Sequence, residues 1–239
     1  MMRIVVILAF LMASVGADAQ SRQRTWCLTP RVGVNSSDMT GLKWYETLGD
    51  GTNHVAGDME TTRKWGFTAG FDVEGLLHPR FGLSVGVYYS DEGYVFDPFQ
   101  EGTPVYDSSG NQMTASEYVH LHMISVPVLA QFYVLPGLAL KSGVQLSGLT
   151  NAQDHYKGNK TNILNNTKTF HVSIPVGVSY DYKNVSFDVR YLFGLTNFCD
   201  NRAMTDLDAK WRSNSLWMTL GYRIDLYKWK EKKQFSISK

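Results

Sequence analysis

The residue types best suited to nucleophilic chemistry are the two histidines and the serine of one short stretch, His120, His122 and Ser125. A serine nucleophile needs a base within hydrogen-bond reach of its hydroxyl group. The apolar and polar residues around them alternate, which predicts a β-strand whose successive side chains point to opposite faces. The two histidines then share one face and Ser125 lies on the other. We predict no catalytic residues and no enzymatic activity.

A metal site has weaker support. His54, Asp58 and Glu60 fall in a polar segment without a fixed ligand spacing. We therefore predict no metal site and no cofactor. The two cysteines, Cys27 and Cys199, are expected to lie far apart and to stay unpaired.

Charge and apolar surface separate clearly in the stretch 185–196. Asp188 and Arg190 lie two residues apart and therefore on one face of the strand. The opposite face carries only apolar or aromatic side chains, namely Val185, Phe187, Val189, Tyr191, Phe193 and Leu195. A polar barrel lumen can pair such opposite charges, whereas the hydrocarbon core of a bilayer cannot. This strand is predicted to cross a membrane with its apolar face toward lipid.

The same alternation recurs along the chain. The strands are connected alternately by short turns and by long polar segments. Most of the strands have ten or more residues, which suits a tilted crossing of a bilayer. We predict an all-β fold, an eight-stranded antiparallel up-and-down transmembrane β-barrel with short periplasmic turns and long extracellular loops. Three prolines inside these strands are expected to cause bulges or bends. The predicted strands are 25–35, 65–77, 81–95, 118–134, 138–150, 168–182, 185–197 and 213–226.

Charged residues of the predicted strands fall on the inner face. An eight-stranded barrel is just wide enough for side chains to fill, so we expect these charges to form a structural network rather than line a pore. The residues predicted for this lumen charge network are Arg31, Asp72, Glu74, Asp188, Arg190 and Arg223.

The two ends of the chain set the domain limits. Arg3, an apolar run and the small residues Ala17 and Ala19 are typical of a secretory signal peptide. We predict a cleaved signal peptide at 1–19, a barrel domain at 20–227 and a periplasmic tail at 228–239. The formal net charge of +1 argues against nucleic acid as a partner, and the one locally basic stretch, 228–233, is interpreted as a solvated tail.

Several segments, in their order along the chain, resemble the PorT-like outer-membrane β-barrels, small exported barrels of bacteria with two membranes. The resemblance implies localisation in the bacterial outer membrane, an eight-stranded barrel, no established enzymatic activity and a link to protein secretion. Such barrels usually end on an aromatic residue of the last strand, whereas this chain continues past Tyr227. The matching segments are 31–39, 66–70, 83–90, 124–129, 190–197 and 220–223.

The sequence thus predicts a non-enzymatic, structural or partner-binding barrel surrounded by outer-membrane lipid. A protein partner is expected to bind the loops or the periplasmic rim, since exposed loops commonly carry binding sites. The apolar loop residues best able to anchor it are Trp44, Tyr45, Phe99 and Tyr106. The alternative is a soluble calycin-like barrel that binds a small apolar ligand inside.

Overall fold

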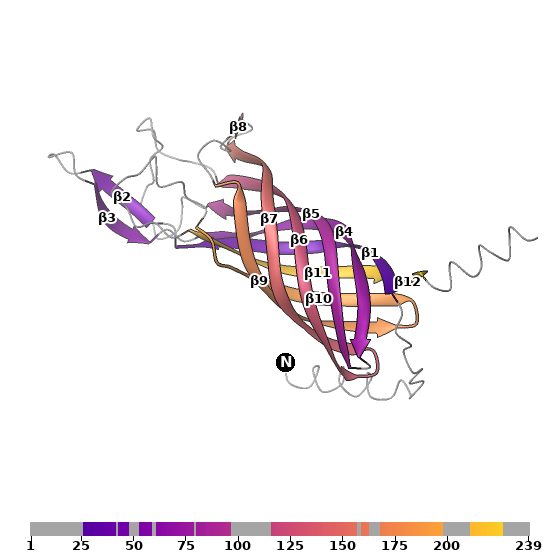
Figure 1. The fold of residues 1–239 in the computed structure, drawn as a ribbon. Coiled ribbons are helices and arrows are strands. Elements are labelled where there is room, and N and C mark those ends of the chain that lie inside the picture. The colour runs from indigo at the N-terminus through magenta and orange to yellow at the C-terminus, as the bar shows by residue number, and fades with distance from the viewer. Residues whose placement is uncertain are drawn as a thin grey trace, which may run out of the picture.

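The computed structural model describes residues 26–41, 43–47, 53–58, 61–78, 80–96, 116–156, 159–162, 168–197 and 211–226. Eight long strands form the wall of a barrel (Figure 1). They are β1 (Trp26–Thr40), β4 (Thr62–His78), β5 (Phe81–Phe96), β6 (Glu117–Leu135), β7 (Leu138–Tyr156), β9 (Phe170–Tyr182), β10 (Val185–Gly194) and β11 (Arg212–Tyr222). Four short strands complete the description: β2 (Lys43–Thr47), β3 (Asn53–Asp58), β8 (Asn159–Asn162) and β12 (Ile224–Asp225).

The wall closes on itself. Each long strand pairs antiparallel with the next one in the chain, and β11 returns to pair with β1, from Arg31 opposite Gly221 to Thr40 opposite Arg212. Closure means that each of the eight long strands of the wall has a paired neighbour on both sides, as a lipid environment requires. The predicted eight-stranded antiparallel barrel is confirmed.

The two ends of the barrel differ in their connections. At the turn end, tight turns join β4 to β5, β6 to β7 and β9 to β10. Gly137 and Lys183 in two of these turns have positive φ angles of 85° and 53°. Such angles suit glycine and are uncommon for other residues, so both turns have little room for sequence change. The other end, here named the loop end, carries the longer connections.

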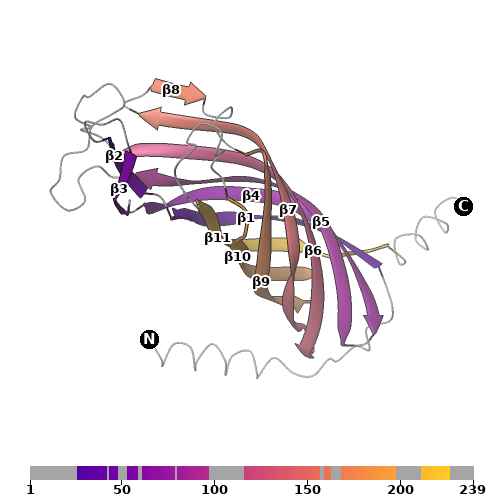
Figure 2. The ribbon, with the colours of Figure 1, turned by 60° about the vertical axis from the view of Figure 1, so that its left-hand side comes forward.

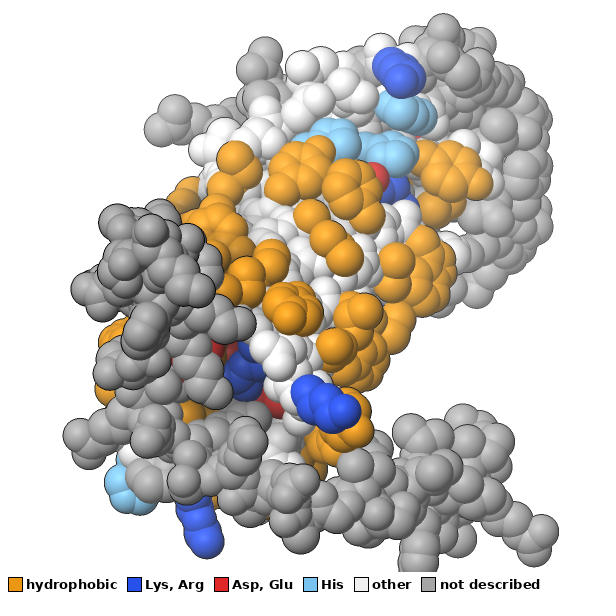
Figure 3. All heavy atoms as spheres, turned by 90° about the vertical axis from the view of Figure 1, so that its right-hand side faces the viewer, with side chains coloured by type: hydrophobic (Ala, Val, Ile, Leu, Met, Phe, Trp, Pro, Cys, Tyr) orange, Lys and Arg blue, Asp and Glu red, His pale blue; other side chains and the backbone are white. Residues whose placement is uncertain are grey.

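The outer surface of the wall is apolar (Figure 3). Every second side chain of β6 points outward and is exposed over the stretch Ile124–Val134, all of them apolar. Ten residue steps of about 3.4 Å, tilted by about 45°, give this belt a height of about 24 Å. Val32 on β1 and Leu220 on β11 are 64% and 54% exposed on the same surface. A belt of this height matches the lipid-facing band of a transmembrane barrel.

The wall is uneven at the loop end. Strands β6 and β7 each have 19 residues, whereas β10 has 10 and β11 has 11. Figure 2 shows β5, β6 and β7 as a tall curving sheet that ends near β8. The segments 36–64 and 151–167, which the sequence leaves between predicted strands, contain more strand than expected, because β1 runs to Thr40, β7 runs to Tyr156, and three short strands lie inside these segments. β1 and β7 continue past the predicted ends because their tops, together with that of β6, bury apolar side chains against one another.

The bulges expected as one outcome at the prolines do not form, since no strand pairing shifts its register at Pro30, Pro127 or Pro175. Around Pro127 the register of β5 and β6 is unchanged, with Val85 opposite Val128 and Tyr88 opposite Ser125. Only the pairs between them, where the proline removes a backbone donor, are missing from the ladder. The missing donors thus interrupt the ladder without shifting it. Among the described residues, no helix is long and apolar enough to cross a membrane.

Candidate functional site: the filled lumen

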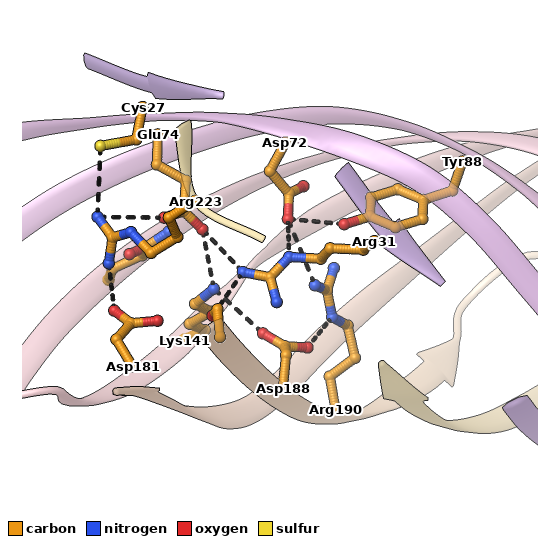
Figure 4. A network of polar contacts seen from close by, with 12 residues as sticks. Cys27, Arg31, Asp72, Glu74, Tyr88, Lys141, Asp181, Asp188, Arg190 and Arg223 are labelled. Carbon is orange, nitrogen blue, oxygen red and sulfur yellow. Dashed lines mark hydrogen bonds and ion pairs between the residues drawn. The ribbon is translucent and has the colours of Figure 1, made fainter. Parts of the chain in front are cut away.

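The lumen near the turn end is built around Arg31 on β1. Its Nε donates to the Asp72 carboxylate at 2.8 Å, and its Nη2 donates to Glu74 at 3.1 Å and to the Ser186 hydroxyl at 3.1 Å (Figure 4). Asp72 and Glu74 lie two residues apart on β4 and therefore point to the same side. The guanidinium group is planar and has several donors, so Arg31 on β1 can bond two carboxylates of β4 and the hydroxyl of Ser186 on β10 at the same time.

Arg190 on β10 and Lys141 on β7 add two more cations to this centre. Arg190 Nε donates to Asp188 at 2.7 Å, and its Nη2 lies 3.8 Å from Asp72. The Lys141 ammonium on β7 lies 3.1 Å from Asp188 and 3.3 Å from Glu74. All five side chains are at most 6% exposed. Strands β4, β7 and β10 are thus linked across the lumen by charge.

Arg223, between β11 and β12, closes the network at the turn end. It pairs with Asp181 on β9, lies 3.8 Å from Glu74, and its Nη2 donates to the sulfur of Cys27 at 3.6 Å. Cys27 is a free, buried thiol, while Cys199 lies outside the described residues.

The network is balanced in charge. It has four cations, Arg31, Lys141, Arg190 and Arg223, and four anions, Asp72, Glu74, Asp181 and Asp188, so the formal charges cancel. Buried ions are costly unless each is paired and hydrogen-bonded. The structure therefore brings together all six residues that the sequence predicts for the lumen, and adds Lys141 and Asp181 to them.

Two aromatic residues at this level were missed by sequence reasoning. The Tyr88 hydroxyl donates to Asp72 at 2.6 Å, and Arg190 lies over the Tyr88 ring at 5.4 Å and the Trp217 ring at 6.0 Å. Both aromatic side chains are fully buried. Their alternation was the available signal, since Tyr88 falls between the outward-facing Val87 and Tyr89. Cation–π contacts of this kind add to the ionic ones in a dry environment.

Above the aromatic pair the lumen is polar but small. Trp217 Nε1 donates to the Glu92 carboxylate at 3.2 Å, and the Ser90 hydroxyl donates to the same oxygen at 3.1 Å. A cavity of about 30 Å³ lies beside Glu92 and is also lined by Gln145 and Ser147. That volume has room for about two water molecules.

Near the loop end the inside of the barrel becomes apolar. Buried side chains of β1, β6 and β7 pack with one another there, with Tyr94 and Trp211 against them. This apolar cluster consists of Met39, Val119, Leu121, Met123, Leu149 and Ala152. The lumen thus changes from charged to apolar along the barrel axis.

The candidate nucleophile lies apart from its candidate bases. Ser125 faces inward, fully buried, with its hydroxyl 2.8 Å from that of Ser147. His120 and His122 face outward on the same strand. Among the described residues, no group of three or more His, Cys, Asp or Glu side chains has the arrangement of a metal site.

The remaining predicted residues are not described at the level of side chains. Trp44 and Tyr45 belong to β2, of which only the backbone is described. Phe99 and Tyr106 lie outside the described residues, and so do the side chains of His54, Asp58 and Glu60.

An apolar exterior around a charged interior is the reverse of a soluble barrel, and defines a transmembrane β-barrel. The soluble calycin-like alternative is therefore not favoured. Residues 18–200 match the family model described as outer membrane protein beta-barrel domain, and the chain belongs to this family. No match to a curated protein was found.

Solved outer-membrane barrels are similar in fold. Neisserial surface protein A is 13% identical, covers 83% of this chain and 97% of its own, with a TM-score of 0.46. Ail, the attachment invasion locus protein of Yersinia pestis, is 12% identical over 84% of this chain and 99% of its own, with a TM-score of 0.42 in its complex with a heparin analogue. OprG from Pseudomonas aeruginosa is 9% identical over 86% of this chain and 99% of its own, with a TM-score of 0.42.

Proposed function

We propose that this chain is a non-enzymatic outer-membrane barrel whose lumen is a structural plug and whose exposed loops bind a partner. The charge-balanced network of eight side chains, seven of them buried, carries the proposal, since its members bind one another and leave little charge to attract a permeating ion. The small cavity beside Glu92 supports the same role. The PorT-like resemblance suggests protein secretion as the process served.

Planar-bilayer recording of the purified full chain tests the plug. We expect no steady single-channel conductance from the wild-type barrel. Arg190→Ala, which opens space beside Asp188, serves as the comparison and should give brief openings more often than the wild type. A large, steady conductance from the wild-type protein would show an open pore and rule out the plug.

Partner binding and export are tested in cells. Trp44, Tyr45, Phe99 and Tyr106 are the proposed anchors, and a variant with all four changed to alanine should lose cross-links to its partner while the barrel still assembles. Tyr118→Ala, an exposed aromatic residue of β6, is the control. Cross-links that survive the fourfold change would contradict the loop proposal.

Mass spectrometry of the exported protein tests the cleavage of the signal peptide. It should find Gln20 as the first residue and the tail 228–239 intact.

A further inference from the structure

A group of polar rings lies on the outer face of the barrel, at the loop end of the apolar belt. This histidine patch consists of Tyr89 and Asp91 on β5, His120 and His122 on β6, and His155 on β7. The ring centroids of His120 and His155 are 4.7 Å apart, and those of Tyr89 and His122 are 6.0 Å apart. Figure 3 shows histidine side chains gathered at one end of the apolar surface.

The height of the patch places it at the level of lipid headgroups. The exposed apolar belt of β6 ends at Ile124, and His122 and His120 occupy the next two outward positions. Two residues of a strand tilted by about 45° correspond to about 5 Å, so these rings lie about 5 and 10 Å beyond the edge of the hydrocarbon. Barrels usually carry a girdle of aromatic residues at the membrane interface. At the histidine patch the rings at this level are imidazoles, whose nitrogens can form hydrogen bonds.

The ring nitrogens have defined neighbours on the protein side. The Tyr89 hydroxyl lies 2.8 Å from His122 Nδ1, and Asp91 lies 3.3 Å from His120 Nδ1. When the Tyr89 hydroxyl donates to Nδ1, the proton of neutral His122 is on Nε2, which is then a donor. The side chains of His122 and His120 are 23% and 27% exposed, which leaves them accessible to a lipid.

The charges around the patch favour an anion over a cation. The Lys64 ammonium lies 2.8 Å from Asp91 and neutralises it, and thereby takes the position that a metal ion would need. Lys160 on β8 is exposed and stands opposite His155 in the β7–β8 ladder. With Asp91 offset by Lys64, the exposed Lys160 leaves the patch with a positive charge.

We propose that the histidine patch binds the phosphate group of a membrane lipid headgroup at the loop end of the barrel. The Nε2 atoms of His120 and His122, whose Nδ1 atoms face Asp91 and Tyr89, donate hydrogen bonds to the phosphate oxygens together with Lys160. His155, whose Nε2 lies 3.3 Å from the Gln153 side chain, borders the site. The lipid chains lie along the apolar belt. Bonds of this charge-assisted type are among the strongest that side chains form with oxygen anions.

Native mass spectrometry of the folded full chain in detergent, with added dioleoyl phosphatidic acid, tests the proposal. The triple variant His120→Phe, His122→Phe, His155→Phe keeps aromatic rings but loses their donors. It should retain the lipid about tenfold less well than the wild type, the loss expected for one charge-assisted hydrogen bond. His78→Phe, at an exposed histidine of the turn end, is the matched control and should bind as the wild type.

Further arms separate the sources of binding. Phosphatidylcholine, whose phosphate is masked by choline, should bind weakly to both proteins, and inorganic phosphate should not displace the phosphatidic acid. Should the triple variant fail to fold, His122→Phe and His122→Gln replace it, and only the second, which keeps a donor, should retain the lipid. Equal retention by wild type and donor-free variants, or displacement by inorganic phosphate, would overturn the proposal.

Discussion

The two halves of the barrel interior use opposite chemistry within one continuous set of strands. Near the turn end the buried residues are ions such as Arg31, Asp72 and Arg190, whereas near the loop end they are Leu121 and Met123. The outer face changes in the opposite sense, from apolar at Val126 to polar at the histidines of β6. Each half thus places its apolar side chains away from water.

The difference shows that the solvent outside the wall decides what the wall buries. At the height of the apolar belt the wall is surrounded by hydrocarbon, so charged side chains can be placed only in the lumen. Beyond the belt the surroundings are water, and the strand tops bury apolar side chains as a soluble barrel does. On β6 the reversal falls between Met123, which is buried inside, and Ile124, which is exposed outside. The lower half is held by paired charges and the upper half by hydrophobic burial.

The largest effect is expected from breaking the charged half. Arg190→Ala leaves Asp188 without its shortest partner and removes the cation above Tyr88 and Trp217. Loss of one member of a buried ion pair costs about 3 to 5 kcal/mol, because the remaining charge stays buried. Urea unfolding of the barrel in vesicles measures this change, with Lys168→Ala as the exposed control.

A double variant sharpens the same test. Arg190→Ala combined with Asp188→Ala should cost less than the sum of the two single changes, because the pair is then removed together. Lys141 also bonds Asp188, so part of the cost should remain. Strict additivity of the two changes would mean that the Arg190–Asp188 pair itself does not stabilise the barrel.

A smaller effect is expected in the apolar half. Leu121 is 1% exposed and packs in the apolar cluster of the strand tops. Leu121→Ala should cost about 2 kcal/mol, at the low end for buried leucines because the cluster lies near the rim. Tyr118→Ala on the outer face of the same strand should change the unfolding free energy by about 0.5 kcal/mol or less. A cost for Leu121→Ala as small as that of the control would show that the strand tops are not packed in solution.

Most of the fold could be predicted because the charged half obeys one simple rule. Alternation with period two placed Asp188 and Arg190 inside and Phe187 outside, and each lies there in the structure. The sequence predicts β6 to its top, as the strand 118–134, but it ends the first strand at 35 and the strand of β7 at 150, so the tops of β1 and β7 are predicted to be loops. His120 and Leu121 alternate as clearly as residues of the belt, and reading them as polar-out and apolar-in was feasible from sequence.

The composition of the network was harder to predict. The period of two puts Lys141, Tyr88 and Trp217 on the inner face, but it does not say which inner residues of different strands stand at one height. Height follows from the register between strands, which pairs Arg190 with Trp217 and Gly70 with Tyr88. Register is fixed by turns and packing together, and a single sequence carries only part of that information.

The last predicted effect is a dependence of stability on pH, and it concerns Glu117 at the loop-end tip of β6, seven residues beyond the edge of the belt and outside the membrane. Burial, together with a hydrogen bond and charge repulsion from Asp154, raises the pKa of Glu117 to about 8. Between its ordinary pKa, about 4.3, and this value, the folded protein holds a proton that the unfolded chain has released. Stability contributed by this group is therefore lost as the pH rises through that window.

Glu117→Gln keeps a neutral side chain at every pH, so its unfolding free energy should fall less steeply between pH 5 and pH 8 than that of the wild type. The unfolding free energy of the variant should therefore rise relative to that of the wild type across this window. The difference between the two unfolding free energies should become constant above about pH 8. Asp154→Asn, which removes the neighbouring charge, should reduce the slope in the same direction. Urea unfolding at several pH values and constant ionic strength measures all three slopes. Identical slopes for wild type and Glu117→Gln would mean that Glu117 titrates normally, and that the strand tops do not exclude water as the apolar half requires.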